Sequence, residues 1–328
     1  MSRPSPRVIV ITGPTATGKT AFGALIAKSK NGEVVSADSM QVYKRMDIGT
    51  AKPTETERMG VPHHMIDIVQ PWEDYSVARY VAEASQCVDD IVGRGKLPVI
   101  VGGTGLYIDS LLSGREFSSR GGAILREALE TEYDDIGGDA MLRKLGEFDP
   151  ESAAKLHAND KKRIVRAFEA YKTTGKTISQ HDMETKSLPP RYDAVKFALN
   201  YSDRTELYER IDRRVDAMLE KGLEGEIRGL LEMGIPRDCT AMQAIGYKEM
   251  AEAILGECGF HDAVGRIKTG SRHYAKRQLT WLRSDEAVKW LVWDKEPDFD
   301  RAIEAICDRM HDSGDCGSLA AMTGWECI

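Results

Sequence analysis

Long hydrophobic runs and leader-like segments are absent from this sequence. Its first six residues are too few and too polar for a signal peptide, and no run approaches the roughly 18 apolar residues of a membrane-spanning helix. Aromatic residues make up only 7% of the 328 residues and charged residues 30%, which is typical of a globular protein and not of a disordered or fibrous one. With 41% hydrophobic residues the chain can bury a substantial core. We therefore expect a soluble, cytoplasmic protein with no membrane partner.

Cysteine is sparse and shows no framework spacing. The six cysteines are scattered, and no C-x2-C pair occurs. Scattered thiols are typical of a reducing compartment, and a structural zinc site needs closely spaced ligands. The sequence therefore predicts reduced cysteines and no zinc site. The cysteines are Cys87, Cys239, Cys258, Cys307, Cys316 and Cys327.

Positive net charge is also lacking, since the formal net charge is −7. A protein that coats nucleic acid non-specifically is usually basic, because phosphate binding depends on clustered Lys and Arg. Two local stretches depart from the acidic average. Six cations and one acid lie between Lys161 and Lys176, and six cations and no acid lie between Arg266 and Arg283. Each stretch is either a solvated helix face or a surface for an anionic ligand.

Strand-like and helix-like segments alternate along most of the chain. This alternation predicts a parallel sheet with right-handed crossovers, an α/β fold, and ligands bind such a sheet beyond the carboxyl ends of its strands. The predicted strands are 7–12, 33–37, 97–101, 194–199 and 288–293, and helices are predicted at 20–28 and 77–92. Helices are also predicted to dominate the ranges 204–233 and 242–283, with one short helix after the last strand.

Strand signals are missing from the middle of the chain. We expect an α/β core formed by residues 1–113 and 191–328, interrupted by a helical insertion domain at 114–190. For the last helix of the insertion, Asn159 is the predicted N-cap and Gly175 the predicted stop. The final fifteen or so residues are predicted to be loose. The helices predicted in the insertion are 124–133, 140–148 and 160–174.

One motif carries a definite chemistry. Residues 13–20, GPTATGKT, match G-x-x-x-x-G-K-[ST] and lie between a predicted strand and a predicted helix, as this phosphate-binding loop requires. Its backbone N–H groups and the helix start attract phosphate, Lys19 neutralises the oxygens, and the Thr20 hydroxyl can hold Mg²⁺. The motif predicts a polyphosphate site without naming the polyphosphate. Its residues are Gly13, Pro14, Thr15, Ala16, Thr17, Gly18, Lys19 and Thr20.

The second acid that an NTPase usually places at a neighbouring strand end is missing. The strand at 97–101 ends in two glycines and a threonine. Asp38 is the only acid at a predicted strand end that faces the loop. It is either an ordinary loop aspartate or helix cap, or a metal ligand or general base, and the core sequence alone does not separate these interpretations.

Beyond the loop, an ordered set of segments resembles the tRNA dimethylallyltransferases, the tRNA isopentenyltransferase family. The segments extend over nearly the whole chain, and the lack of a C-terminal C-x2-C…H-x-H finger favours the bacterial type. They are ADSMQVY (37–43), MDIGTAKP (46–53), PHHMID (62–67), YS (75–76), VGGTGLY (101–107), HAND (157–160), GY (246–247) and KRQLTWLR (276–283).

The resemblance implies a P-loop NTPase-like core and a reaction. The reaction is transfer of a dimethylallyl group from dimethylallyl diphosphate to the exocyclic N6 of the adenosine 3′ of a tRNA anticodon, with release of diphosphate. It also implies that Asp38 is the general base, that Thr20 lies near the leaving group and Mg²⁺, and that Arg214 contacts the diphosphate. The residues implied to contact tRNA are Asp38, Ser39, Met40, Gln41, Thr104, Arg126, Lys162, Arg163, Ile164, Val165, Arg166, Lys276, Arg277 and Arg283.

Three other functions remain open at this point. A small-molecule phosphotransferase would bind ATP in the loop and use Asp38 as base for a hydroxyl. A prenyltransferase could instead act on free adenine nucleotides, although the basic helical insertion speaks against this. A non-catalytic RNA-binding protein would leave Lys19 and Thr20 without a role. We expect a monomer, because no exposed heptad or long apolar face is evident.

Overall fold

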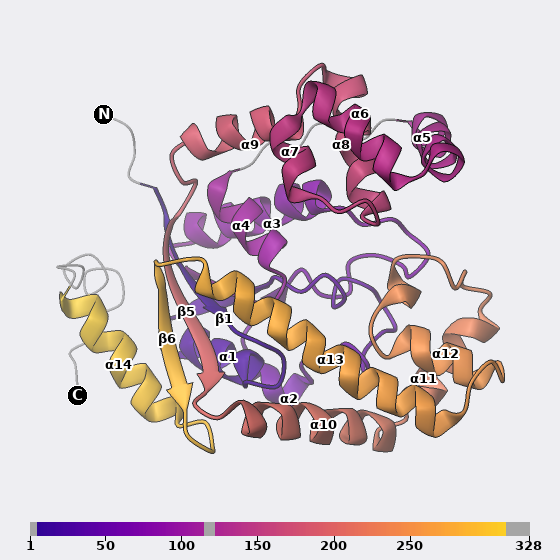
Figure 1. The fold of residues 1–328 in the computed structure, drawn as a ribbon. Helices are drawn as coiled ribbons and strands as arrows, with labels where there is room; N and C mark the ends of the chain where they lie inside the picture. The colour runs from indigo at the N-terminus through magenta and orange to yellow at the C-terminus, as the bar shows by residue number, and fades with distance from the viewer. Residues whose placement is uncertain (1–4, 115–121, 313–328) are drawn as a thin grey trace. The chain divides into compact units, whose positions relative to one another are not determined.

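The computed structural model describes residues 5–114 and 122–312. The chain divides into two compact units, one within 1–112 and 192–328 and the other within 113–191. The first unit contains a six-stranded sheet with helices packed on it, and the second is built from helices (Figure 1). The C-terminal segment that the sequence predicts to be loose lies outside the described residues.

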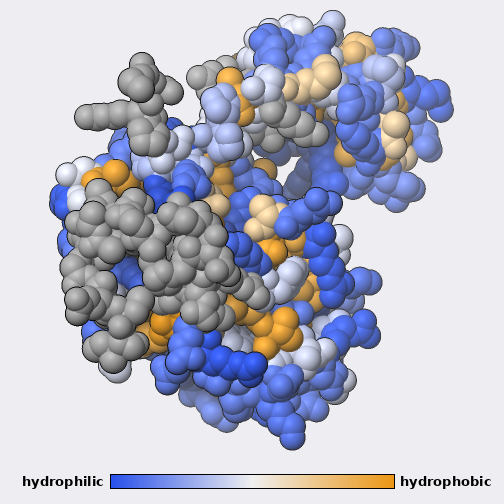
Figure 2. All heavy atoms as spheres, turned by 90° about the vertical axis from the view of Figure 1, so that its left-hand side faces the viewer, coloured by the Kyte–Doolittle hydropathy of each residue, from blue (hydrophilic) through white to orange (hydrophobic). Residues whose placement is uncertain are grey.

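The described surface is mainly polar where it can be seen. On the face in Figure 2, hydrophilic residues predominate and hydrophobic residues form small groups. Within the described ranges, none of the helices combines the length and the hydropathy needed to cross a bilayer.

The sheet is parallel throughout, with strand order β3-β2-β4-β1-β5-β6. The central strand β1 pairs on one side with β4 and on the other with β5, so that Ile9 lies between Val99 and Val195. This confirms the predicted α/β class. The two-residue strand β3 was not predicted, because a segment this short shows no alternation. The strands are β1 (Arg7–Thr12), β2 (Gly32–Ser36), β3 (His63–His64), β4 (Leu97–Val101), β5 (Asp193–Tyr201) and β6 (Val288–Trp293).

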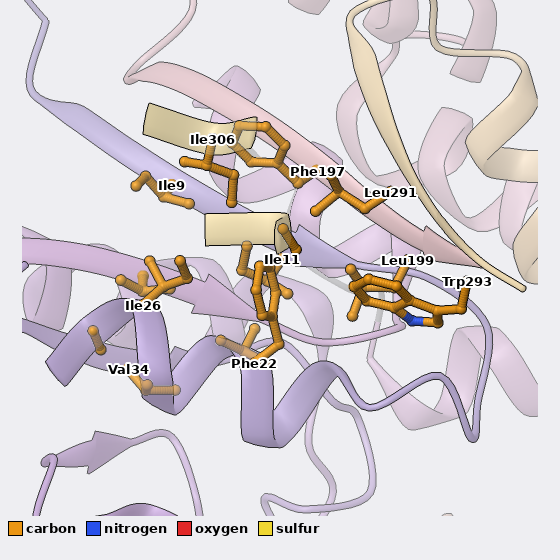
Figure 3. Close-up of a cluster of buried hydrophobic side chains, with 14 of the residues drawn as sticks. Ile9, Ile11, Phe22, Ile26, Val34, Phe197, Leu199, Leu291, Trp293 and Ile306 are labelled. Atoms are coloured by element: carbon orange, nitrogen blue, oxygen red, sulfur yellow. The ribbon is translucent and has the colours of Figure 1, made fainter. Parts of the chain in front are cut away.

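The main hydrophobic core lies between the sheet and the helices beside it. Strand β1 is a run of β-branched residues because both of its faces are covered. Ile11 of β1 packs in one cluster with Phe22 of helix α1 and Trp293 of β6 (Figure 3). The Trp293 indole Nε1 also donates a hydrogen bond of 3.2 Å to the Thr17 carbonyl oxygen. The core therefore holds the phosphate-binding loop directly.

Helices predominate after β5, as the sequence predicts for 204–233 and 242–283, and a glycine divides each range. Gly222 adopts a left-handed conformation (φ 96°) that ends one helix and begins the next. Gly256 (φ 76°) lies in the break of the second range. The helices of this unit are α1 (Lys19–Ser29), α2 (Glu55–Arg58), α3 (Val77–Gly93), α4 (Gly105–Ser113), α10 (Arg204–Glu220), α11 (Leu223–Glu232), α12 (Tyr247–Ile254), α13 (Phe260–Arg283) and α14 (Phe299–Asp312), with a 3-10 turn η1 (Ala241–Gln243).

The second unit has its own small core. Leu129, Met141, Ile164 and Phe168 are among the buried side chains that its helices share. Gly175 ends α8 as predicted, with φ 73°. The predicted Asn159 cap is wrong, because α8 begins after Asp160, whose carboxylate turns back to accept the His157 N–H at 3.0 Å. The helices are α5 (Ala123–Ile136), α6 (Gly138–Phe148), α7 (Pro150–Lys155), α8 (Lys161–Thr174) and α9 (Ile178–Ser187).

Candidate active site

The phosphate-binding loop joins β1 to α1 at the carboxyl edge of the sheet. Gly13 (φ 140°) has no room for a side chain, because a methyl carbon there would lie 2.4 Å from the Leu199 carbonyl oxygen. Helix α1 begins after Gly18 (φ 87°), with no side-chain cap and no acid in its first turn. The first N–H groups of a helix need partners, and here they are left to an anionic ligand.

Lys19 turns back onto the loop that precedes it. Its Nζ donates a 2.6 Å hydrogen bond to the Pro14 carbonyl oxygen. Burial and then the charge of Arg214 lower the pKa of Lys19 to about 7, although Asp38 acts in the opposite direction. Burial also lowers the pKa of Arg214, while Asp38 raises it. Two cations thus crowd one site, and a polyanion between them would relieve their repulsion.

Asp38 lies at the start of the loop after β2, and one of its carboxylate oxygens accepts hydrogen bonds from that loop. Its Oδ1 accepts the N–H groups of Met40 at 2.9 Å and Gln41 at 3.3 Å. The next residue, Ser39, donates its N–H to the Thr104 hydroxyl at 3.0 Å, which ties the β2 and β4 strand ends together. The Oδ2 atom has no hydrogen-bond partner among the described residues. One oxygen of the Asp38 carboxylate therefore has the structural role of an ordinary loop aspartate. The other oxygen is available to a ligand.

Two adjoining cavities bring the predicted catalytic residues together. The smaller, of about 70 Å³, is lined by Lys19, Thr20, Asp38 and Arg214, and Asp38 supplies the one carboxylate among its lining residues. The larger, of about 300 Å³, shares Thr15, Asp38 and Arg214 with the first. Its other walls are largely apolar: Ile211, Val215, Met218, Leu223, Ile245 and Ile267. The site thus joins a polar, cationic chamber to an apolar one.

Helix α13 completes the site with Gln278, a residue that was assigned no individual role from the sequence. Gln278 accepts the Thr15 N–H at 3.0 Å and donates to the Gly103 carbonyl oxygen at 2.9 Å. Gln278 is buried, and it lies one helical turn from Tyr274, whose hydroxyl also reaches Gly103. A buried glutamine among apolar positions of a helix is the signal that could have indicated this contact.

The two histidines at 63 and 64 have different surroundings. His64 Nε2 lies 2.8 Å from the buried carboxylate of Glu33, which also pairs with Arg94 and Lys96. These partners, Arg94 first, hold the pKa of Glu33 well below its usual range. His64 is therefore part of a structural ion-pair cluster. His63 instead lines the smaller cavity, and its buried Nε2 has no hydrogen-bond partner within the described structure.

The predicted cations of α13 are exposed and without an acidic partner. Lys276, Arg277 and Arg283 form no ion pair with any described residue. Arg277 lines the larger cavity, and its guanidinium lies 5.7 Å from the centre of the Tyr274 ring. The charge of this surface is available to a phosphate backbone.

The predicted residues of the second unit divide into exposed and buried ones. Lys162 and Arg163 are exposed on α8, and Arg126 is exposed on α5, where it pairs with Glu130. Arg166 pairs with the buried Glu169 at 2.8 Å. The side chains of Ile164 and Val165 are packed in the core of this unit at 0% and 2% exposure, so the predicted surface is confined to the charged members of the segment.

The described residues contain no group of three or more His, Cys, Asp or Glu side chains that could hold a metal ion. Oxygen donors are nevertheless present in the smaller cavity, where the Thr20 hydroxyl and the Asp38 carboxylate both line the wall. Mg²⁺ prefers oxygen ligands and often takes most of them from water and a bound phosphate.

The fold and this site define a P-loop α/β protein that binds a phosphorylated ligand beside an apolar chamber. A family model described as "IPP transferase" matches residues 41–285, and one described as "Isopentenyl transferase" matches residues 6–67. The chain belongs to the IPP transferase family. This confirms the resemblance seen in the ordered sequence segments.

Curated relatives extend along most of the chain. The tRNA dimethylallyltransferases of Caldanaerobacter subterraneus and Acetivibrio thermocellus are each 48% identical to it, covering 92% and 91% of this chain and 96% of each relative. A solved tRNA isopentenylpyrophosphate transferase from Bacillus halodurans has a TM-score of 0.71 at 41% identity, covering 97% of this chain and 99% of that one. A eukaryotic dimethylallyltransferase acting on tRNA has a TM-score of 0.79 at 32% identity, covering 94% and 80%.

Proposed function

We propose that this protein transfers a dimethylallyl group from dimethylallyl diphosphate to the exocyclic N6 of the adenosine 3′ of a tRNA anticodon, releasing diphosphate. The observation that carries the proposal is the pair of adjoining cavities, in which Asp38 and Arg214 line both the cationic chamber and the apolar one. The names of the relatives, which act on tRNA, support the same reaction.

The leaving group belongs in the phosphate-binding loop. The N–H groups at the start of α1, the Lys19 ammonium and the Arg214 guanidinium surround the smaller cavity. Negative charge grows on the diphosphate as the bond from its oxygen to the allylic C1 breaks, and preorganised donors of this kind stabilise that charge. A loop that binds ATP in other proteins serves here to hold a departing diphosphate.

Asp38 is the proposed general base. The lone pair of N6 forms the new bond to C1, the C1–O electrons leave with the diphosphate, and the N6 proton passes to Asp38. Its Oδ1 is fixed by the Met40 and Gln41 N–H groups, so the carboxylate is oriented while Oδ2 remains available for the proton. Removing this proton is useful because an exocyclic adenine amine is a poor nucleophile, and such catalysis contributes about 10² to 10⁴-fold.

The apolar chamber suits a five-carbon allyl group next to the phosphate. One face of α10 carries Ile211, Arg214, Val215 and Met218 toward the larger cavity, so apolar side chains flank the arginine on the same helix. Apolar walls keep water from the electrophilic carbon. The adenosine must leave its base stack to reach this chamber, and extrusion costs least in a single-stranded loop.

Mg²⁺ is part of this proposal, because the residues present fit it. Thr20 would hold it beside the diphosphate, and Mg²⁺ would supply charge neutralisation at the leaving group. Lys19 and Arg214 act on the same diphosphate from the protein side.

The proposed tRNA surface consists of exposed cations and of the loops that surround the larger cavity. Lys276, Arg277 and Arg283 on α13 would pair with phosphates, and Arg277 would do so at the cavity wall. Ser39, Met40 and Gln41 follow Asp38, and Thr104 fixes Ser39, so these residues would set where the adenosine lies. On the second unit, Lys162, Arg163, Arg166 and Arg126 are the proposed contacts. We propose a monomer as the active form, because the sequence has no evident exposed heptad or long apolar face.

Transfer of a radiolabelled dimethylallyl group to unmodified tRNA tests the proposal. Wild-type protein with Mg²⁺ should label tRNA, and Asp38→Ala should reduce kcat by about a hundredfold or more, because the base is removed. The matched control is Asp90→Ala, which changes an exposed aspartate on α3. Failure of folded wild-type protein to label tRNA, together with ATP-dependent phosphorylation of a small molecule, would replace the proposal with a phosphotransferase.

A further inference from the structure

Two of the ordered sequence segments, at 46–53 and 246–247, have no part in the chemistry described above. The structure joins them through Glu226, a residue of α11 outside both segments. The Glu226 carboxylate accepts three consecutive backbone N–H groups, from Asp47 at 2.7 Å, Ile48 at 2.8 Å and Gly49 at 3.2 Å. Successive N–H groups that converge in this way form a concave anion-binding turn, and here the anion is a side chain of the same protein.

The second segment supplies the fourth donor. The Tyr247 hydroxyl, at the start of α12, donates to Glu226 Oε1 at 2.5 Å, and Tyr247 is fully buried. The ring also packs closely against the turn, since a methyl carbon on Gly49 would lie 2.4 Å from Tyr247 Cε2. Gly49 is therefore required so that the turn can approach the ring. We refer to Glu226, Tyr247 and the 47–49 turn as the carboxylate clamp.

The carboxylate clamp is connected to the base loop by a short chain of hydrogen bonds. Gly49 and Thr50 line the larger cavity, beside Asp38. The Gln41 amide nitrogen donates to the carbonyl oxygens of Thr50 and Ala51, at 3.3 Å each, and the Gln41 backbone N–H donates to Asp38 Oδ1 at 3.3 Å. A shift of the 47–50 backbone would therefore change both the wall of the cavity and the support of Asp38.

We propose that Glu226 is a positioning residue for the tRNA half of the reaction. It holds the 47–50 wall of the cavity where the adenosine enters and, through Gln41, holds the base loop. A carboxylate suits this role because it only accepts hydrogen bonds, and four donors converge on it. A glutamine would turn an N–H₂ group toward at least one of these donors. The inference rests on the proposed function, since it assigns Glu226 to the adenosine side of that reaction.

None of the hydrogen bonds of Glu226 and Tyr247 among the described residues reaches the phosphate-binding loop, and this separates the two substrates. Asp38, Gln41, Ala51 and Pro53 are among the residues that line the smaller cavity, but Gly49, Thr50 and the residues of α11 are not. Loosening the clamp should therefore impair the use of tRNA while leaving the binding of diphosphate unchanged. A defect of folding alone would impair both.

The test compares Glu226→Ala and Glu226→Gln with Glu224→Gln as the matched control. Glu224 is on the same helix, but its side chain is half exposed and pairs with Arg228 at 2.7 Å. For Glu226→Ala we expect kcat/KM for tRNA to fall on the order of a hundredfold, as misplacement near a reacting centre by about 1 Å can do, with a smaller loss in Glu226→Gln. The Kd of inorganic pyrophosphate in Mg²⁺, measured by calorimetry, should stay within about twofold of wild type.

Two results would overturn the inference. One is kcat/KM for tRNA in Glu226→Ala equal to that of Glu224→Gln, and the other is an equal loss of pyrophosphate affinity. If Glu226→Ala does not fold, Glu226→Gln and Tyr247→Phe carry the same comparison, because Tyr247→Phe removes one of the four donors and keeps the ring. Absence of transfer by wild-type protein would contradict the proposed function itself, so the two failures are distinguishable.

Discussion

The state of charge of Lys19 is set by its neighbours and not by its own chemistry. Burial and the adjacent Arg214 bring the pKa of Lys19 down to about 7, and Asp38 compensates only in part. In the free protein a large share of the Lys19 side chains is therefore neutral at and above pH 7. A bound diphosphate adds several negative charges to the site and should restore the proton, because an opposite charge favours the charged form of a base.

We predict that pyrophosphate binding takes up a proton at Lys19. Since the pKa rises on binding, affinity should be greatest below about pH 7 and should decrease above it, by up to about tenfold per pH unit. Calorimetry at pH 8 in buffers of different ionisation enthalpy should show uptake of about one proton more in wild type than in Lys19→Arg, because a guanidinium stays charged throughout this range. Equal proton uptake by the two proteins would refute the prediction.

Gly102, directly after β4, has no room for a side chain. A methyl carbon on Gly102 would lie 2.2 Å from the Ala37 carbonyl oxygen, which is backbone and cannot rotate away. Gly102→Ala should lower the free energy of unfolding by about 1–3 kcal/mol, as overpacking does. The control is Gly93→Ala, at the end of α3, where nothing lies within 4 Å and the effect should stay within about 1 kcal/mol. Urea unfolding measures both, and equal midpoints would contradict the prediction.

Helix α13 links two parts of the proposed chemistry. Its exposed face carries Lys276 and Arg277, and its buried face carries Gln278, which bonds the phosphate-binding loop at Thr15 and the β4 strand end at Gly103. The same helix therefore meets the proposed tRNA surface and supports the proposed diphosphate site.

We predict that Gln278→Leu weakens pyrophosphate binding by about tenfold, because the Gly103 carbonyl loses a buried partner and the loop loses a support, a change worth about 1–3 kcal/mol. Thr280→Ala, on the exposed face of the same helix, is the control. Titration calorimetry with pyrophosphate in Mg²⁺ gives both Kd values. Wild-type affinity in Gln278→Leu would show that the bridge does not support the loop.

The sequence predicted those elements whose signals are local. The loop at 13–20 and the buried strand at 7–12 are each specified by a short run of residues, so their positions agree with the structure. The position of the break at Gly222 was not predicted within the helical range 204–233, because a single glycine also occurs inside helices. Gln278 and Glu226 were not assigned roles, since each acts mainly through contacts with residues more than 170 positions away. Such pairings depend on the tertiary fold, and no spacing rule reports them.

At the scale of the whole molecule, alternating strands and helices predicted a parallel sheet but not its order. The sequence of residues 7–12 does not indicate that β1 is flanked by β4 and β5. It indicates only that β1 is not an edge strand, because a run of this kind is buried on both faces. The approach of Asp38 to the loop that contains Thr20 was predicted from the strand ends, because the carboxyl ends of parallel strands meet at one edge of the sheet. The presence of Arg214 in the same cavity was implied only by the family resemblance.

The strand order also affects how the protein folds during its synthesis on the ribosome. The loop at 13–20 is synthesised before β5, and β1 finds its second neighbour only when β5, at residues 193–201, has emerged. Contacts within the unit at 113–191 join residues that are closer in the sequence than β1 and β5 are. This unit can therefore fold before β5 has joined the sheet. The phosphate-binding loop therefore gains its complete sheet edge only after residues far downstream of it have been synthesised.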